Sequence, residues 1–190
     1  KFSKDKRIKY YYSKKFLKLY QARNSAVLKS KGDLISFIDS DDWWIRDKLS
    51  KQVSYFNFNK EIKIVYSNLF LYFEKSKKYK LFSKSPLYNG DITQLLLNNF
   101  KMPILTTMIK RELFKKNKFN KKYDIIGDFD FFIRLSLKYK INSSNEPLAY
   151  YRVHNSNMSD KRIDIHIKEL EEWKKKSQLN NNLKLYNFNK

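Results

Sequence analysis

The sequence predicts an α/β domain with a mixed, mainly parallel sheet flanked by helices. Segments typical of strands alternate with segments typical of helices, which is the pattern of a sheet covered by helices. The apolar run Leu34–Ile38 is suited to a buried parallel strand, and Asp39, Asp41 and Asp42 follow it directly. Ligands of open α/β sheets bind beyond the carboxyl ends of strands, so this acidic strand end is the first candidate site.

The first third of the chain is predicted to form two strands and two helices. Arg7–Tyr12 is rich in β-forming residues and predicts a strand. Residues 16–31 carry apolar side chains at helical spacing, and Gly32 is a typical stop for this helix. The strand Leu34–Ile38 follows, and Arg46–Phe58 again has the spacing of an amphipathic helix.

The middle of the chain is predicted to be rich in short strands. Runs of β-branched and aromatic residues indicate the strands, and apolar periodicity indicates the helical segments. In chain order we expect strands at Ile62–Tyr66, Leu69–Phe73 and Lys78–Phe82, a helix at Ile92–Asn99, a strand at Leu105–Ile109 and a helical turn at Arg111–Lys115.

The last part of the chain is predicted to form a helix at Asp128–Tyr139, a strand at Pro147–Val153 and a charged amphipathic helix at Ile163–Leu179. The side chains of the first helix that are expected to face the core are Phe129, Phe132, Ile133, Leu135 and Ser136. With no linker or repeat in view, we expect one domain over residues 1–179. A polar, Asn-rich tail over 180–190 is expected to fray.

The composition narrows the possible classes of protein. The chain of 190 residues is 42% hydrophobic, which is enough for a packed core. It has no cysteine, which excludes disulfides, thiolate metal sites and a cysteine nucleophile. No apolar run approaches the ~18 residues of a membrane span. The amino-terminal residues lack the apolar stretch of a signal peptide and an initiator Met, so we expect the chain to be a fragment.

The charge is strongly positive. Lys and Arg number 41 against 19 Asp and Glu, which gives a formal net charge of +22. A surface of this sign attracts nucleic acid, anionic lipid headgroups or polyphosphates. The alternative is a coding bias toward AT-rich codons, which would spread lysines over the whole surface. The basic residues are dispersed along the chain, and both explanations stay open.

The acidic strand end predicts a metal–nucleotide site. Three carboxylates at Asp39, Asp41 and Asp42 repel one another, so an ordered site needs something to offset their charge. Mg²⁺ and Mn²⁺ take oxygen ligands and often share them with substrate phosphates. The alternative is a solvated acidic turn that caps the next helix. Trp43 and Trp44 follow where such a turn would be polar, and we expect them to pack rather than to stack on a sugar.

Four clusters of residues occur in a characteristic order. Ala22–Asn24 precedes the acidic segment Phe37–Trp43, and Gly127–Leu135 and Tyr150–Asn155 follow it. In order and spacing they resemble the family 2 glycosyltransferases of the GT-A fold, which is Rossmann-like. The resemblance extends over residues 7–160.

The sequence departs from the family pattern at two places. Family members begin with a strand, a nucleotide-contacting loop and a second acidic strand end. None of these is present, so we expect the chain to lack the N-terminal strand–helix–strand portion. Gly127 stands where the family often carries an acidic residue, whereas the aspartate that follows it, Asp128, is retained.

The resemblance assigns roles to three carboxylates. Asp39 and Asp41 match the family's Asp-x-Asp pair, in which one residue orients the ribose and a metal-bound water and the other ligates the metal at the diphosphate. Asp128 matches the general base of inverting members, which takes the proton of the acceptor hydroxyl. A helix N-cap is the alternative for Asp128, and the two roles are compatible.

Roles are also expected for five further residues. By the resemblance, Arg23 and Asn24 contact the nucleotide sugar, although a helical Arg is often only ion-paired or solvated. His154 is expected to join the metal or the diphosphate, with an unremarkable loop histidine as the alternative. Asp42 either lies behind the metal ligands or caps the next helix. Asp130 either supports the site or is solvated.

The function that the resemblance implies is transfer of a sugar from a nucleoside-diphosphate sugar to an acceptor hydroxyl, with inversion and with Mg²⁺ or Mn²⁺. The expected acceptor is a bacterial surface glycan or a lipid-linked saccharide. We expect a cytoplasmic protein, with the cytoplasmic face of the membrane as a peripheral docking place. The alternatives are a basic module that binds nucleic acid or an anionic surface, and a non-catalytic glycosyltransferase remnant. No specific nucleic acid is expected, because the chain has no such motif.

Overall fold

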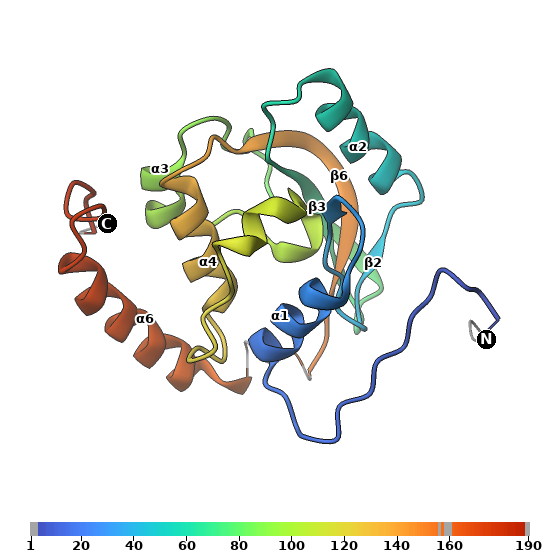
Figure 1. Ribbon diagram of the computed structural model, residues 1–190, viewed down its shortest axis with the longest axis horizontal. Helices are drawn as coiled ribbons and strands as arrows, with labels where there is room; N and C mark the ends of the chain where they lie inside the picture. Colours follow the sequence, from blue (N-terminus) through green and yellow to red (C-terminus); the bar gives the residue numbers. More distant parts are fainter. Residues whose placement is uncertain (1–3, 156, 158–160, 189–190) are drawn as a thin grey trace.

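The computed structural model describes residues 4–155, 157 and 161–188, and its centre is a mixed sheet of six strands. The order is β1-β5-β3-β6-β2, with β4 paired to β3. The long strands β3 and β6 form the curved middle of the molecule (Figure 1). The strands are β1 (Leu34–Ile35), β2 (Trp43–Trp44), β3 (Ile64–Phe73), β4 (Lys78–Leu81), β5 (Met108–Lys110) and β6 (Asn142–Val153).

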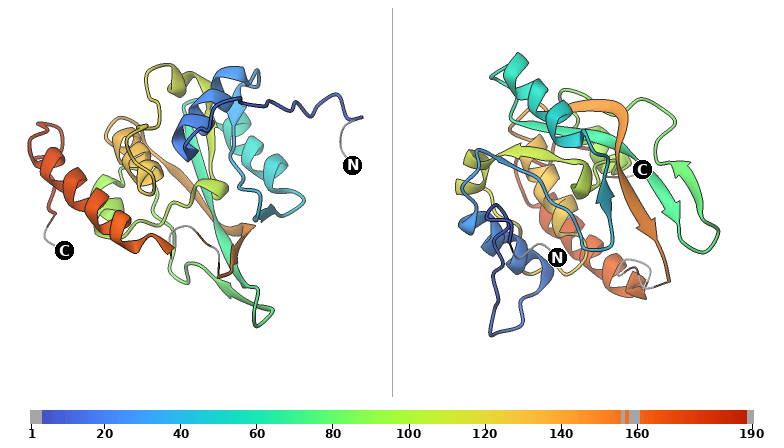
Figure 2. Two further views of the ribbon diagram at one scale, coloured as in Figure 1. Left: turned by 90° about the horizontal axis from the view of Figure 1, so that it is seen from below. Right: turned by 90° about the vertical axis from the view of Figure 1, so that its right-hand side faces the viewer.

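Helices cover both faces of the sheet. They are α1 (Leu19–Lys29), α2 (Lys48–Phe58), α3 (Thr93–Asn98), α4 (Gly127–Ser136) and α6 (Ile163–Gln178), with 3-10 turns η1 (Ile104–Thr106) and η2 (Arg111–Lys115). Figure 2 shows α2 apart from the group formed by α4 and α6. Side chains alternate across a strand, so Ile64 and Tyr66 face the large core around α4, whereas Val65 packs with Phe56 of α2.

The predicted α/β class is confirmed, but the sheet is not mainly parallel. Among the paired strands of the described chain, β3 with β6 is parallel and every other pairing is antiparallel. The strand expected at Leu34–Ile38 is reduced to two residues at the sheet edge, antiparallel to β5. The two strands expected at Ile62–Tyr66 and Leu69–Phe73 are one strand, β3, and its pairing with β6 shifts register at Asn68.

The strand predicted at Arg7–Tyr12 is wrong within the described chain. These residues belong to an arm that runs along the outside of the body (Figure 1), and the side chains of Tyr10 and Tyr12 are 85% and 77% exposed. A strand requires a neighbour for its backbone hydrogen bonds, and no described segment pairs with this arm. High β-propensity alone does not form a strand.

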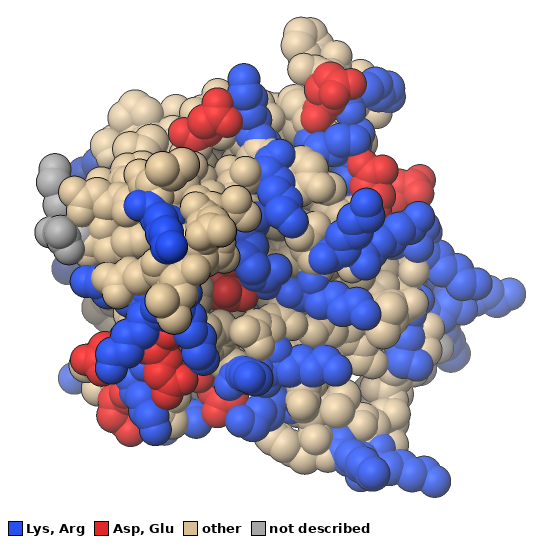
Figure 3. Space-filling model, turned by 60° about the vertical axis from the view of Figure 1, so that its left-hand side comes forward, with Lys and Arg blue, Asp and Glu red and all other residues tan. Residues whose placement is uncertain are grey.

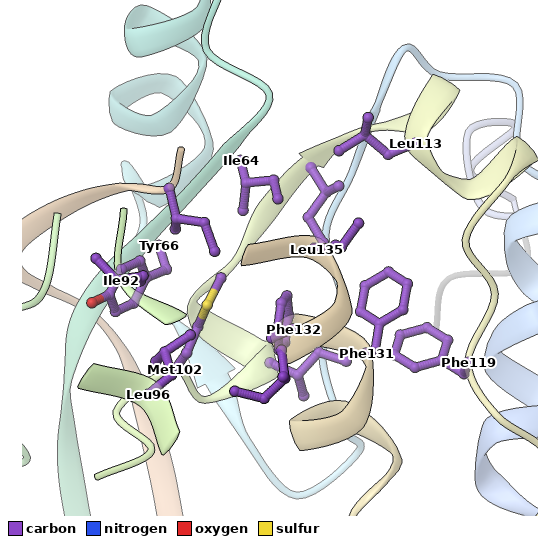
Figure 4. Packing of buried hydrophobic residues seen from close by; sticks show 14 of the residues in the cluster. Ile64, Tyr66, Ile92, Leu96, Met102, Leu113, Phe119, Phe131, Phe132 and Leu135 are labelled. Atoms are coloured by element: carbon purple, nitrogen blue, oxygen red, sulfur yellow. The ribbon is translucent and has the colours of Figure 1, made fainter. Parts of the chain in front are cut away.

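The core is dominated by aromatic and aliphatic side chains around α4 (Figure 4). Phe132, Ile133, Leu135 and Ser136 are buried as predicted, whereas Phe129 is partly buried and packs against Trp173 of α6. Phe131 was not expected inside, yet it is fully buried, with its ring centroid 4.2 Å from that of Phe119. The helix is covered on several sides, so more of its circumference is apolar than one core face requires.

The polar tail does not fray over residues 180–188. Leu183 is buried in the main core, and Tyr186 and Phe188 pack against it. The backbone of Asn187 exchanges two hydrogen bonds of 2.9 Å with the Gln94 side chain on α3. The outer ends of the predicted domain and tail, 1–3 and 189–190, lie outside the described residues.

One face of the surface shows how the excess of basic residues is distributed. On the face shown in Figure 3, Lys and Arg side chains are spread widely, with small groups of Asp and Glu between them. Among the described helices, none combines the length and the apolar character that crossing a bilayer requires.

Candidate active site

Most of the sequence-predicted site residues meet at one cavity of about 320 Å³. Arg23 comes from α1, Asp39 and Asp41 from the loop after β1, and Asp128 from the start of α4. Residues 103–105 form a further part of the wall. Three other segments, from α1, residues 103–105 and the start of α4, thus meet the acidic loop after β1.

Arg23 and Asp39 form an ion pair at the wall of this cavity. The guanidinium Nη2 of Arg23 donates to both carboxylate oxygens of Asp39, at 2.8 and 3.0 Å. Arg23 is 8% exposed, and its guanidinium lies 5.6 Å from the centre of the Tyr20 ring. The guanidinium thus offsets one negative charge of the acidic loop without a metal ion, and the partial exposure of Asp39 keeps the contribution of this ion pair to stability modest.

Asp41 lies against His154, at the end of β6. The distance between Asp41 Oδ2 and His154 Nε2 is 2.9 Å. These two residues are 113 positions apart in the sequence, and they meet because β2 pairs with β6 beside the acidic loop. The structure therefore places the imidazole of His154, which does not itself line the cavity, in direct contact with a carboxylate that does.

These donors fit a divalent cation that shares its ligands with a phosphate. Within the described residues, no three His, Asp or Glu side chains are placed to hold a metal ion together. Asp41 and His154 offer one oxygen and one nitrogen donor, whereas Asp39 is held by Arg23. Mg²⁺ commonly takes one or two carboxylates and obtains its other ligands from phosphates and water. Two protein donors are compatible with that pattern.

Asp42 does not cap the following helix. Its Oδ1 accepts a hydrogen bond of 2.9 Å from the backbone N–H of Arg152, whereas α2 begins at Lys48. Burial raises the pKa of Asp42 to about 6, and the neighbouring carboxylates Asp41 and Asp39 add to this rise. Asp42 thus fixes the acidic loop to β6.

Asp128 is the second residue of α4 and not its N-cap, which is Ile126. Its Oδ1 accepts a hydrogen bond of 2.9 Å from the backbone N–H of Phe129. The same Oδ1 accepts a second hydrogen bond, of 3.3 Å, from the Tyr20 hydroxyl, so both hydrogen bonds that the described residues donate to this carboxylate end on Oδ1. Burial raises the pKa of Asp128, while the nearby Arg23 acts in the opposite direction. A carboxylate with a raised proton affinity and one uncommitted oxygen at a cavity is suited to accepting a proton.

Glu169 holds the segment that leads into α4, and sequence reasoning missed it. Its carboxylate accepts hydrogen bonds from the backbone N–H groups of Asp124, Ile125 and Ile126, at 2.5, 3.0 and 3.1 Å. No local signal distinguishes Glu169 from the other charged residues of α6, because its partners lie more than 40 positions away. The contact ties α6 to the backbone that carries Asp128.

Asn24 and Asp130 do not line the cavity. The Asn24 amide exchanges two hydrogen bonds with the backbone of Phe119, at 2.9 and 3.0 Å. Asp130 is buried, pairs with Arg134 and accepts a hydrogen bond of 3.0 Å from Trp173 Nε1. Both polar groups are satisfied internally and hold α1 and α6 in place, so Asp130 is not a solvated residue.

The two tryptophans pack, as expected. The ring of Trp43 stacks on that of Tyr150, with 5.1 Å between ring centroids. Trp44 Nε1 donates a hydrogen bond of 2.9 Å to the carbonyl of Leu105 in the cavity wall.

A buried lysine supports the same wall. Lys48 is fully buried, and its Nζ donates a hydrogen bond of 2.6 Å to Gln52 and lies 4.4 Å from the centre of the Trp44 ring. Gln52 in turn donates to the carbonyl of Thr106, at 2.7 Å. No carboxylate of the described residues pairs with Lys48, and burial lowers its pKa to about 7.

Lys48→Met is expected to remove a pH dependence from the stability of the fold. Because the pKa of Lys48 is about 7 in the folded chain and about 10.4 in the unfolded chain, the unfolded chain binds more protons between these values. The free energy of unfolding of the wild type should therefore rise from pH 7 to pH 9.5, by a few kcal/mol relative to Lys48→Met. Urea denaturation at both pH values measures this difference. Parallel changes in the two proteins would contradict it.

The chain is similar to known glycosyltransferases. A family model described as Glycosyl transferase family 2 matches residues 1–138. An uncharacterized glycosyltransferase of Methanocaldococcus jannaschii, MJ1057, is 27% identical over 186 residues, which are 95% of this chain and 64% of that protein. WfaP of Escherichia coli, a UDP-Glc:alpha-D-GlcNAc-diphosphoundecaprenol beta-1,3-glucosyltransferase, is 31% identical over 140 residues, which are 73% of this chain and 53% of WfaP.

A solved structure has the same fold. TarS 1–349 of S. aureus in complex with UDP-GlcNAc superposes with a TM-score of 0.55 at 13% identity, over 73% of this chain and 40% of that chain. At this level of identity the likeness concerns the fold alone. The chain spans less than two thirds of the length of each of these proteins.

Proposed function

This chain belongs to glycosyl transferase family 2, and from that premise we propose that its cavity binds a nucleoside-diphosphate sugar and transfers the sugar to an acceptor hydroxyl. The observation that carries the proposal is the meeting of Asp39, Asp41 and Asp128 at one cavity. The first two come from the loop after β1 and the third from α4. One wall can therefore hold a diphosphate while the other accepts a proton.

In the proposed reaction, Asp128 accepts the proton of the acceptor hydroxyl on its uncommitted Oδ2. The acceptor oxygen forms a bond to the anomeric carbon as the bond from that carbon to the diphosphate breaks, which inverts the configuration. A Mg²⁺ or Mn²⁺ ion held by Asp41 and His154 would offset the negative charge of the departing diphosphate. The ion pair with Arg23 holds Asp39 at the cavity wall, where it orients the donor.

The resemblance implies that Arg23 and Asn24 contact the nucleotide sugar, and we propose this contact for Arg23 alone. Arg23 lines the cavity, whereas the Asn24 amide is committed to the backbone of Phe119. We assign Asn24 the role of holding α1, and with it Arg23, against the segment before α4.

The proposed donor is a UDP-sugar and the proposed acceptor a lipid-linked saccharide. The name of WfaP, which includes UDP-glucose and a diphosphoundecaprenol-linked GlcNAc, supports both choices. The net charge of +22 supports peripheral contact with an anionic membrane, where such an acceptor would be met.

The test is calorimetric binding of UDP-glucose and UDP-GlcNAc to the 190-residue chain in the presence of Mn²⁺, followed by transfer to a GlcNAc-diphosphate lipid. We expect saturable binding that requires the metal, and release of UDP together with a product one hexose heavier. Binding without transfer would favour a non-catalytic remnant. No nucleotide binding, together with salt-sensitive binding of random DNA, would favour the nucleic-acid alternative.

A further inference from the structure

The ring of Tyr20 fills the space that a side chain at position 127, at the start of α4, would need. A Cβ atom on Gly127 would lie 2.4, 2.5 and 2.6 Å from three atoms of the Tyr20 ring. The ring is 2% exposed and stacks on Phe119, with 5.7 Å between ring centroids, so it has little room to withdraw. The absence of a side chain at Gly127 is thus what admits the Tyr20 ring against the helix.

The position of the ring places a hydroxyl beside Asp128. Tyr20 Oη lies 2.6 Å from the carbonyl oxygen of Ile125 and 3.3 Å from Asp128 Oδ1. From these contacts we propose that Tyr20, admitted by Gly127, is a positioning residue that sets the orientation and the proton affinity of Asp128. The inference rests on the proposed function, because it takes Asp128 as the group that accepts the proton.

The hydroxyl has one proton and two neighbours. The carbonyl of Ile125 and the ionised Asp128 carboxylate can only accept, so the hydroxyl shares its proton between them, at 2.6 Å from the carbonyl oxygen and 3.3 Å from Asp128 Oδ1. A hydroxyl that donates to a carboxylate stabilises the ionised form, so Tyr20 lowers the pKa of Asp128 against the rise that burial produces. Tyr20 thus helps to keep Asp128 in the form that can accept the proton of the acceptor hydroxyl. Because Oδ1 also accepts from Phe129, the proton is received on Oδ2.

Other charged groups act on Asp128 as well. Arg23 of α1 favours the ionised form, and burial opposes it. The remaining titratable groups that line the two cavities touching Asp128, or that hold the segment before α4, are Asp39, Asp41, Asp42, Asp124, Tyr151, His166 and Glu169. Tyr20 itself stays a neutral hydroxyl, because burial raises its pKa above the ordinary value. Removal of the hydroxyl alone therefore isolates its effect from these charges.

The experiment is carbon-13 NMR titration of the Asp128 carboxyl group in the wild type and in Tyr20→Phe. Phe keeps the ring against Gly127 and removes the hydroxyl that donates to Asp128, so we expect the titration midpoint of Asp128 to rise by about half a pH unit or more. In the transfer assay, kcat should fall roughly 3- to 10-fold with an unchanged KM for the donor. Gly127→Ala displaces the same hydroxyl by a different route and should also raise the midpoint.

Tyr66→Phe is the matched control. Tyr66 is a buried tyrosine whose hydroxyl donates to the Tyr88 carbonyl at 2.8 Å, away from the cavity, so the midpoint of Asp128 should not change. A midpoint that falls in Tyr20→Phe would mean that the hydroxyl does not donate to the carboxylate, and an unchanged midpoint would mean that the ring only packs. Either result overturns the proposal. The titration requires no turnover, so a missing transfer activity would count against the proposed function and not against this pair.

Discussion

Asp128→Asn is expected to reduce sugar transfer by about 10²–10⁴-fold, the usual contribution of a general base, while donor binding stays near the wild-type level. Asn has the same shape and can still accept the hydrogen bond from the backbone of Phe129, so the start of α4 should be preserved. It cannot take the proton of the acceptor hydroxyl. Initial rates of UDP release with saturating donor and acceptor measure the loss, and calorimetry with the donor measures binding.

Asp130→Asn on the same helix is the control for Asp128→Asn. Asp130 pairs with Arg134 and Trp173 and does not line the cavity, so its loss should lower stability more than turnover. In the wild type the transfer rate should also fall with decreasing pH, through a pKa above the usual range of an aspartate, because burial raises the pKa of Asp128. Near-normal turnover of Asp128→Asn would leave this residue a structural part of α4.

Local sequence patterns predicted most of the helices, whose hydrogen bonds join residues close together in the chain. Helical periodicity located α2, α4 and α6 to within a few residues at each end, and β-propensity located β4. The same reasoning failed at Arg7–Tyr12 and at Leu34–Ile38, because a strand depends on a partner that its own sequence does not encode. It also failed at Phe131, which is buried because α4 is covered on more than one side.

In the site, too, short sequence motifs were predictive, whereas contacts between residues far apart in the chain were not. The order of the motifs was sufficient to select Arg23, Asp41 and Asp128, which all line one cavity in the structure. The contacts that support these residues were not predictable, because they join positions far apart in the chain. Glu169 meets the segment before α4, and Tyr20 meets Gly127. The glycine was visible as a departure from the family pattern, but the ring that requires it could be found only in the fold.

Asp41→Asn is expected to remove the metal dependence of donor binding. Asn lacks the negative charge that attracts a divalent cation, yet it keeps the size of Asp41 beside His154, so the fold should be retained. In Mn²⁺ the affinity for UDP should fall by about 10- to 100-fold, a common loss when a metal site is perturbed. Asp91→Asn is the control, because Asp91 does not line the cavity and its carboxylate is largely exposed.

A cycle with EDTA separates the metal role of Asp41 from its contact with His154. If Asp41 binds the cation, the wild type should lose affinity for UDP when EDTA replaces Mn²⁺, whereas Asp41→Asn should change little. In EDTA the two proteins should then bind UDP about equally, because the contribution of Asp41 acts through the ion. Equal affinities in Mn²⁺ would instead restrict Asp41 to fixing the end of β6 through His154, and would move the search for a metal ligand to Asp39 and Asp42.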